Sequence, residues 1–317
     1  MKDIILPDQG NGNIPGQIYF ANEDRFTTST FSQPLTTYSV GWTDPENLQA
    51  ALDWIAPAIP VSRRFEFKEA INNQVFLSET DDIRAIGSHF KRVQYDGKTV
   101  NEKTHNKGLT IRLDKDEMID GDEERSVFRL MTRLLRNDLR RAHDALYAAT
   151  VDSVIKAAWK DKAQPDDDLA EAIIAAGDIV GMDPNRLLIG SRPWLMRRRC
   201  YNAQAMAGAF AAAGMSVGDV ADTLGLDGGR ISKVRYQVTK DKKQQLVGNY
   251  AFLYFGDQSA GKDDPTTIKR FVTPSVPEGM RVFRHELDKF IDISVDHYSN
   301  IVVTSSLGAT RLDISNS

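Results

Sequence analysis

The chain of 317 residues has one cysteine, Cys200, and therefore cannot form an internal disulfide. No window of 18 residues is apolar throughout, which argues against a membrane-spanning helix. The first ten residues, MKDIILPDQG, lack an apolar core of signal-peptide length. We therefore expect a chain that folds in a reducing cytoplasm and has no contact with a membrane.

Neither sign of charge dominates, because 40 basic residues face 44 acidic ones and the net charge is −4. This balance excludes a polycation that binds nucleic acid along its whole surface, so any such contact needs a local patch. With 41% apolar and 26% charged residues the composition is that of a globular protein, and it excludes disordered and collagen-like chains. The length allows one large domain or two ordinary ones.

Enzyme and metal motifs are absent or incomplete. The five histidines lack metal-ligand spacing, and no Gly-x-Ser-x-Gly is present. Residues 256–262 match the start of a phosphate-binding loop, but Asp263 stands where Ser or Thr must hold Mg²⁺. The acids between residues 114 and 124 fail as a calcium loop, since Met118 occupies a ligand position. We predict no catalytic, cofactor-binding or metal-binding residues, and no enzyme activity.

Cys200 follows three arginines, which could lower the pKa of its thiol and create a nucleophile. A free cysteine in an apolar helical segment is more often a small core residue, and no histidine lies near it in sequence. A cytoplasmic enzyme that uses Cys200, or the 256–262 loop, stays as an alternative.

The first 60 residues are expected to be extended and irregular. Glycine and proline come first, a Ser/Thr-rich stretch covers 27–43, and only 45–55 predicts a short helix. Such an arm buries little surface by itself. Its many aromatic side chains favour an arm that is held against a partner.

Short polar strands follow the arm. Phe65 and Phe67 alternate with charged residues, Asp96-Gly97 has the composition of a two-residue type I′ turn, and residues 109–113 alternate again. A long hairpin with so few apolar residues is only marginally stable by itself, so we expect it to pack against a partner surface as well.

The strongest local signal is helical. Three acids, Asp122 to Glu124, follow Gly121 where acids favour a helix N-terminus, and apolar residues then recur every three or four positions. The pattern predicts one helix that ends near Trp159 and is about 55 Å long at 1.5 Å per residue. A compact domain is usually narrower than that.

The same helix carries a basic stripe. Residues 125–141 hold six arginines and one acid, Asp138, for a local charge of +5. Five of the arginines recur at steps of three and four: Arg125, Arg129, Arg133, Arg136 and Arg140. The stripe is either a solvated face, with carboxylates on neighbouring chains as possible partners, or a surface that faces phosphates without reading bases.

The remainder predicts mixed α/β structure. We expect a helix over 168–176, a strand over 186–189, a helix opened by Pro193, and strands over 231–239 and 246–255. Apolar and polar residues alternate over 291–295, which is typical of a strand in a sheet with one solvent-exposed face. An arm, a hairpin and an overlong helix that all need partners are typical of a subunit completed by copies of itself.

The order of these parts resembles the major capsid proteins of tailed bacteriophages, which have the Hong Kong 97 fold. The resemblance runs from about residue 60 onward. Its segments are Phe76 to Gly87, Asn101 to Leu109, the helix from Glu123, Asn185 to Gly190 with Trp194, Val234 to Gln237, Phe252 to Gly256, Asp292 to Tyr298, and Ala309 to Leu312.

The resemblance implies an α+β capsid fold in five parts. These are an N-terminal arm (1–60), an extended β-hairpin loop (61–114), a peripheral domain with the spine helix (115–163), an inserted α/β axial domain (164–275), and returning strands of the peripheral domain (276–317). Loop residues implied to reach a neighbouring subunit are Arg64, Asp96, Gly97, Lys98, Lys103 and Lys107.

The implied function is a major capsid protein that self-assembles into pentamers and hexamers of an icosahedral phage head. Its partners would be copies of itself, packaged double-stranded DNA bound without sequence specificity, a separate scaffolding protein and a portal. It would belong to the virion and assemble in the host cytoplasm. An encapsulin-like container for protein cargo is the alternative with the same fold, and no pattern identifies a covalent cross-link between a loop lysine and a neighbour.

Overall fold

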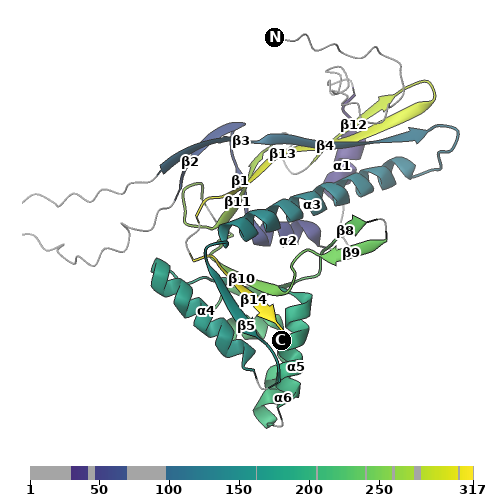
Figure 1. The fold of residues 1–317 in the computed structure, drawn as a ribbon. Helices are drawn as coiled ribbons and strands as arrows, with labels where there is room; N and C mark the ends of the chain where they lie inside the picture. Colours follow the sequence, from purple (N-terminus) through teal and green to yellow (C-terminus); the bar gives the residue numbers. More distant parts are fainter. Residues whose placement is uncertain are drawn as a thin grey trace, which may run out of the picture. The chain divides into compact units, whose positions relative to one another are not determined.

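The computed structural model describes residues 30–41, 47–69, 98–161, 163–204, 206–239, 241–258, 261–274, 280–305 and 308–316 (Figure 1). Two segments of the predicted loop, the Asp96-Gly97 turn and residues 76–87, lie outside these ranges. The chain divides into two compact units. The first unit comprises residues 1–42, 108–131 and 278–296, and the second unit comprises residues 43–107, 132–277 and 297–317.

In the first unit a helix lies against a β-hairpin. β12 (Arg281–Glu286) pairs antiparallel with the first part of β13 (Phe290–Val303), and β4 (His105–Asp114) also pairs with β13. A side chain at Gly108 would meet the Cβ of Asp296 at 3.1 Å, so this close approach of β4 to β13 favours glycine.

Helix α1 (Gln33–Gly41) packs on this hairpin, and the expectation of irregular structure at these residues was wrong. Ser39 donates a hydrogen bond to the carbonyl of Met280 at 3.2 Å, and Phe31 meets Phe283 edge-to-face. These contacts with residues more than 200 positions away stabilise a Ser/Thr-containing helix whose own residues favour it only weakly.

The second unit is built on a mixed five-stranded sheet of order β5-β14-β10-β6-β7. The strands are β5 (Val154–Ala158), β14 (Thr310–Ser315), β10 (Tyr250–Tyr254), β6 (Arg186–Gly190) and β7 (Gly228–Ser232). β10 runs antiparallel to both of its neighbours, whereas the β5–β14 and β6–β7 pairs are parallel.

Helices cover one face of this sheet. They are α4 (Pro165–Val180), α5 (Ser191–Asn202) and α7 (Val217–Thr223), while α6 (Ala207–Gly214) packs on α5. Because side chains alternate along strands, Leu187, Leu253 and Leu312 share this face and are buried among the helices.

The rest of the second unit holds two antiparallel strand pairs and strand β11 (Ile268–Thr273), which pairs antiparallel with the second part of β13 and parallel with β1 (Ala58–Pro60). β2 (Arg64–Glu69) pairs with β3 (Lys98–Lys103), and β8 (Arg235–Thr239) pairs with β9 (Lys242–Gln245). α2 (Leu48–Ile55) buries Leu48 and Leu52, and residues 48–60 are part of this unit.

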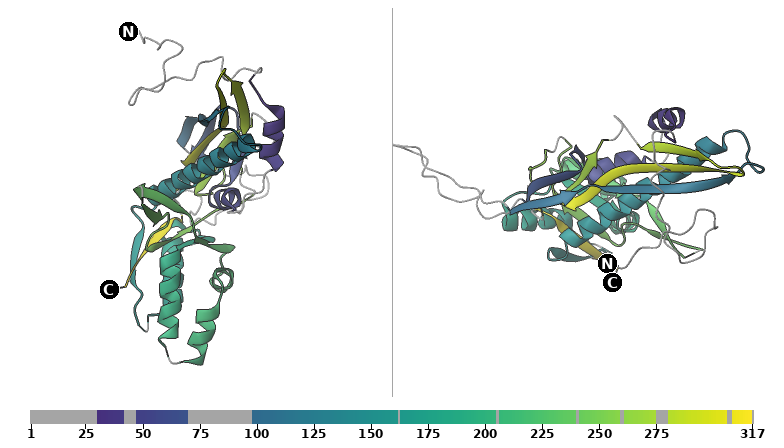
Figure 2. Two further views of the ribbon diagram at one scale, coloured as in Figure 1. Left: turned by 90° about the vertical axis from the view of Figure 1, so that its right-hand side faces the viewer. Right: turned by 90° about the horizontal axis from the view of Figure 1, so that it is seen from above.

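Helix α3 (Asp122–Ala149) contributes residues to both units and is uninterrupted (Figures 1 and 2). The predicted N-terminus is confirmed, but the predicted end near Trp159 was wrong, and 28 residues span about 42 Å. Thr150 ends the helix by donating hydrogen bonds to the carbonyls of Leu146 and Tyr147. The next residues form β5, which pairs with β14 at the far end of the sequence.

The C-terminal strand β14 contains most of the segment 309–312, which the resemblance assigns to the returning strands of the peripheral domain. It pairs with β10 and β5 in the sheet of the second unit. No helix in the described ranges has the length and apolarity needed to cross a membrane.

Candidate assembly and nucleic-acid surfaces

The predicted arginine stripe is exposed on α3. Apolar residues at three- and four-residue spacing are buried along one side of the helix, from Val127 to Leu146. The intervening positions face solvent, and all five predicted arginines are exposed: Arg125, Arg129, Arg133, Arg136 and Arg140. We call these five residues the α3 arginine face.

Four of these arginines, Arg125, Arg129, Arg133 and Arg140, are neutralised little by acidic side chains that the structure describes. Arg125 lies 3.1 Å from Asp122 and Arg140 lies 3.8 Å from Asp144, both as exposed pairs within the helix. Such pairs contribute little energy and do not prevent an arginine from meeting another anion. Arg129 and Arg133 form no ion pair with any residue that the structure describes. The α3 arginine face can therefore meet phosphate groups.

The one acid among these arginines, Asp138, is buried and has several partners. Its Oδ1 accepts hydrogen bonds from Lys107 Nζ at 2.8 Å and Arg141 Nη1 at 2.7 Å. Its Oδ2 lies 2.9 Å from His297 Nε2 and 3.4 Å from Ser299 Oγ. We call these five residues the Asp138 cluster, which sequence reasoning missed because its members are distant in sequence.

Burial by itself raises the pKa of Asp138 and lowers that of Lys107. For Asp138 the hydrogen bonds and charges of His297 and Lys107 outweigh burial, so its pKa lies below the ordinary value. Lys107 was predicted to reach a neighbouring subunit. Its Nζ instead lies inside the second unit, bonded to Asp138 and Ser299, which removes it from the surface available to partners.

The other described loop residues are exposed on the β2–β3 hairpin. Arg64 faces Lys103 in the register of the two strands, and Lys98 lies 3.9 Å from Glu69. The base of the hairpin is fixed by Phe65 and Phe67, whose rings pack on Phe271. The hairpin thus presents polar side chains from a rigid base.

An open groove of about 1130 Å³ lies beside this base. Pro60, Phe65 and Pro274 contribute apolar surface to it, and Arg64 and Lys103 lie on its wall. The groove combines apolar and charged surface, as protein contacts do.

Cys200 does not lie in a site that activates a thiol. It is buried among apolar side chains of the second unit, and burial raises its pKa. Arg197, the buried arginine closest to it in sequence, is occupied by Asp166, with Nε and Nη2 at 2.6 and 2.7 Å from the two carboxylate oxygens. The expectation that Cys200 is a core residue is confirmed.

The 256–262 segment does not form a phosphate cradle in its described part. Lys269, which is fully buried, donates hydrogen bonds to the carbonyls of Lys262 and Asp264. Asp263 accepts a hydrogen bond from the backbone N–H of Lys68. These contacts attach the loop to its own chain and place carboxylates where a phosphate would need donors.

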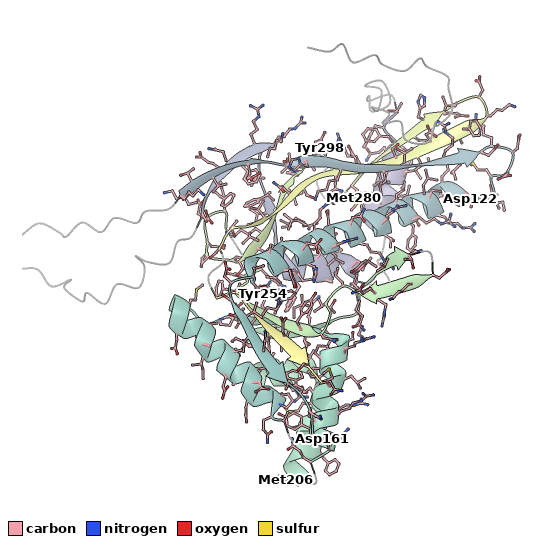
Figure 3. The ribbon with its side chains drawn as sticks, in the orientation of Figure 1. Asp122, Asp161, Met206, Tyr254, Met280 and Tyr298 are labelled. Atoms are coloured by element: carbon pink, nitrogen blue, oxygen red, sulfur yellow. The ribbon has the colours of Figure 1, made fainter. Side chains whose placement is uncertain are left out.

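One apolar surface was not foreseen. Met206 and Phe210, four residues apart at the start of α6, are 69% and 60% exposed. Figure 3 shows Met206 at the turn from α5 into α6, far from Tyr254 in the sheet. Exposed large apolar side chains that share a helix face are typical of a protein contact.

No protein-family model matches the chain, and no curated protein matches it in sequence. Among solved structures, it is similar to a phage-related protein from Bordetella bronchiseptica RB50, with a TM-score of 0.67 and 17% identity over 90% of this chain and 97% of that one. The chain has the α+β fold that the resemblance implied.

Two further similarities span most of the chain. A protein of Gordonia phage Cozz matches with a TM-score of 0.50 and 9% identity, over 86% of this chain and 89% of that one. The capsid of the cyanophage P-SCSP1u matches with a TM-score of 0.48 and 12% identity, over 97% and 93%. At 17% and 9% identity, the similarities to the Bordetella protein and to the Gordonia phage protein establish the fold alone.

Proposed function

We propose that this chain is the major capsid protein of a tailed phage, and that its copies assemble into an icosahedral shell around double-stranded DNA. The observation that carries the proposal is the fold, which is similar to that of a phage-related protein over 90% of the chain. A shared fold hosts more than one function, so the surfaces of this chain must support the same conclusion.

The first supporting surface is the β2–β3 hairpin. Its base is fixed by the packing of Phe67 on Phe271, whereas Arg64, Lys98 and Lys103 are exposed on it. A polar hairpin gains little stability from its own core, so contact with a neighbouring subunit accounts for its composition. In the proposed assembly, pentamers and hexamers form the shell and the hairpin lies over a neighbour.

The second supporting surface is the α3 arginine face, which we assign to the interior of the shell. Exposed arginines bind phosphates of any sequence, and this is what packaged DNA requires. A container for protein cargo has no need for such a surface, so the arginines favour a DNA-filled head over an encapsulin-like compartment. The proposal includes a portal and a separate scaffolding protein as partners, assembly in the host cytoplasm, and the five-part domain division with its axial and peripheral domains.

An enzyme that uses Cys200 is disfavoured, because its thiol is buried and its pKa is raised. The Asp138 cluster and the Asp166–Arg197 pair are occupied by contacts within the chain. Both arrangements stabilise the fold and leave no charged group free for catalysis at these two places.

The proposal is tested by expressing the chain with its neighbouring phage genes and examining the product by negative-stain electron microscopy after nuclease treatment. We expect closed shells that protect DNA. Shells that hold a protein and no DNA would support an encapsulin-like container instead. A monodisperse product of about 35 kDa that forms no particle under any condition would contradict the proposal.

A further inference from the structure

Helix α4 presents an acidic face to solvent. Leu169, Ala172, Ile173 and Ala176 point into the core of the second unit, and α4 contains no lysine or arginine. On the opposite side, Glu171, Ile174 and Asp178 are exposed at positions i, i+3 and i+7, with Ile174 exposed by 61%. These spacings place the three side chains on one side of the helix. We call this the α4 acidic face.

Helix α5 presents the same pattern with the opposite charge. Pro193, Arg197 and Cys200 point inward, and α5 contains no acid. Arg192, Leu195 and Arg199 are exposed, again at positions i, i+3 and i+7, and Leu195 is exposed by 40%. Arg198 is exposed beside them. We call this the α5 basic face.

The charges on both faces are unpaired. In the part of the chain that the structure describes, neither the two acids of the α4 acidic face nor the arginines of the α5 basic face form an ion pair. The ion pair between the two helices, Asp166 with Arg197, involves an arginine on the inner side of α5. Each face therefore offers two or three spare charges around one exposed aliphatic side chain.

A small groove lies beside α4, next to the α4 acidic face. Its volume is about 190 Å³, and apolar atoms of Ile155, Ala175 and Leu312 contribute to its walls. Glu171, Asp168 and Lys156 also line the groove. Burial raises the pKa of Asp168, and its Oδ2 accepts a hydrogen bond from Trp159 Nε1. The groove therefore offers apolar surface to the aliphatic stem of a side chain that reaches Glu171.

We infer that the α4 acidic face of one copy of this chain binds the α5 basic face of the next copy. The inference deepens the proposed function and rests on it, because it names the contact that joins neighbouring subunits around a ring. Opposite charges would pair at both ends of the contact, and Ile174 would meet Leu195 in the middle. Exposed apolar residues flanked by complementary charges are typical of specific protein contacts.

The position of the helices favours a ring. α4 packs on β14 near one edge of the sheet and α5 packs on β6 and β7 at the other, so β10 separates them in the strand order. In the view of Figure 1, α4 is drawn to the left and α5 to the right of β5 and β14. Because the two faces differ, one contact leaves a free face at each end, and contacts continue until a ring closes.

Two charge-reversal variants test the pairing. Variant A carries Glu171→Lys and Asp178→Lys, and variant B carries Arg192→Glu and Arg199→Glu. In each variant alone, like charges would meet across every contact, so we expect at least about a tenfold loss of rings and shells in electron micrographs. An equal number of reversals on the β8–β9 hairpin, Lys242→Glu and Lys243→Glu, should leave assembly unchanged.

Mixing the two variants gives the decisive result. In the mixture, the α4 face of A, which now carries lysines, can pair with the α5 face of B, which now carries glutamates. The unmodified acidic α4 face of B can pair with the unmodified basic α5 face of A. Assembly should therefore return when A and B are combined. Subunits must then alternate, which permits six-membered rings and forbids five-membered ones. A chain with all four substitutions should assemble by itself and form both kinds of ring.

Rescue by mixing also shows that both variants are folded. The pairing is overturned if A and B each assemble like the unmodified chain, if they fail to assemble together, or if the mixture forms five-membered rings. If the unmodified chain forms shells and any of these three results is also found, the α4–α5 contact is rejected but the proposed function is not.

Discussion

Charged side chains on the two sides of helix α3 differ in their exposure to solvent. Asp138 is buried and is bonded to Lys107 and Arg141. Arg136 and Arg140, two residues away on either side, are exposed. A buried charge is costly unless its partners come from the same fold, whereas an exposed charge costs almost nothing to leave available. The comparison separates charges that stabilise the subunit from charges that can meet other molecules.

The largest expected effect follows from removing the buried charge. Asp138→Asn leaves Lys107 without its anion in the interior, so we expect the free energy of unfolding to fall by about 3 kcal/mol. Urea denaturation of the unassembled subunit measures it. Asp152→Asn, at an exposed turn, is the control and should change stability by less than about 0.5 kcal/mol. A loss below about 1 kcal/mol for Asp138→Asn would contradict the assigned role.

The second effect concerns Arg197, the buried arginine of α5. Lysine at this position keeps the charge but loses the two parallel hydrogen bonds to Asp166 and the stacking between Trp194 and Tyr201. We expect Arg197→Lys to cost about 2 kcal/mol, seen as a lower melting temperature. Arg198→Lys, on the exposed side of the same helix, should have the melting temperature of the unmodified chain. Equal melting temperatures for the two variants would contradict the difference between buried and exposed arginines.

The third effect is on acid stability. Since the pKa of Asp138 lies below its unfolded value, the unfolded state binds the proton first as the pH falls. Stability from this group is complete above about pH 5 and should drop by about 1 kcal/mol between pH 5 and pH 3. Denaturation midpoints at several pH values, compared with Asp138→Asn, measure the difference. Parallel curves for the two proteins would show that Asp138 does not contribute.

The smallest effect on stability is expected at the α3 arginine face. Replacing Arg129, Arg133 and Arg136 by glutamate should change the unfolding free energy by less than about 1 kcal/mol, because all three side chains are exposed. Shells should still form but hold less DNA, as measured by the ratio of nucleic acid to protein in purified particles. The matched lysine variant keeps the charge and should fill normally. Unchanged filling with the glutamates would contradict the interior assignment.

Much of the local structure was predictable from the sequence. The start of α3 was predicted from its acidic first turn. The strand predicted over 186–189 from its short apolar run corresponds to β6, Arg186–Gly190. The exposure of the arginines followed from spacing alone, because helix geometry fixes which positions share a side.

The errors have a common cause in long-range contacts. Residues 154–158 continue the apolar pattern without glycine or proline, and only pairing with β14 makes them a strand. The Asp138 cluster joins Lys107, Asp138 and His297, which no local pattern connects. The hairpin turn at Asp96-Gly97 lies outside the described residues and stays a prediction.

The central claim is that this chain is a subunit of a self-assembled shell. Sedimentation velocity of the unmodified chain, purified after co-expression with the proposed scaffolding protein, tests it most directly, because it separates free subunits, rings and shells in solution. We predict a dominant species of many tens of copies, with a smaller population of rings and free subunits. A single boundary at the mass of one chain, 35.4 kDa, at all concentrations and salt conditions would contradict the account.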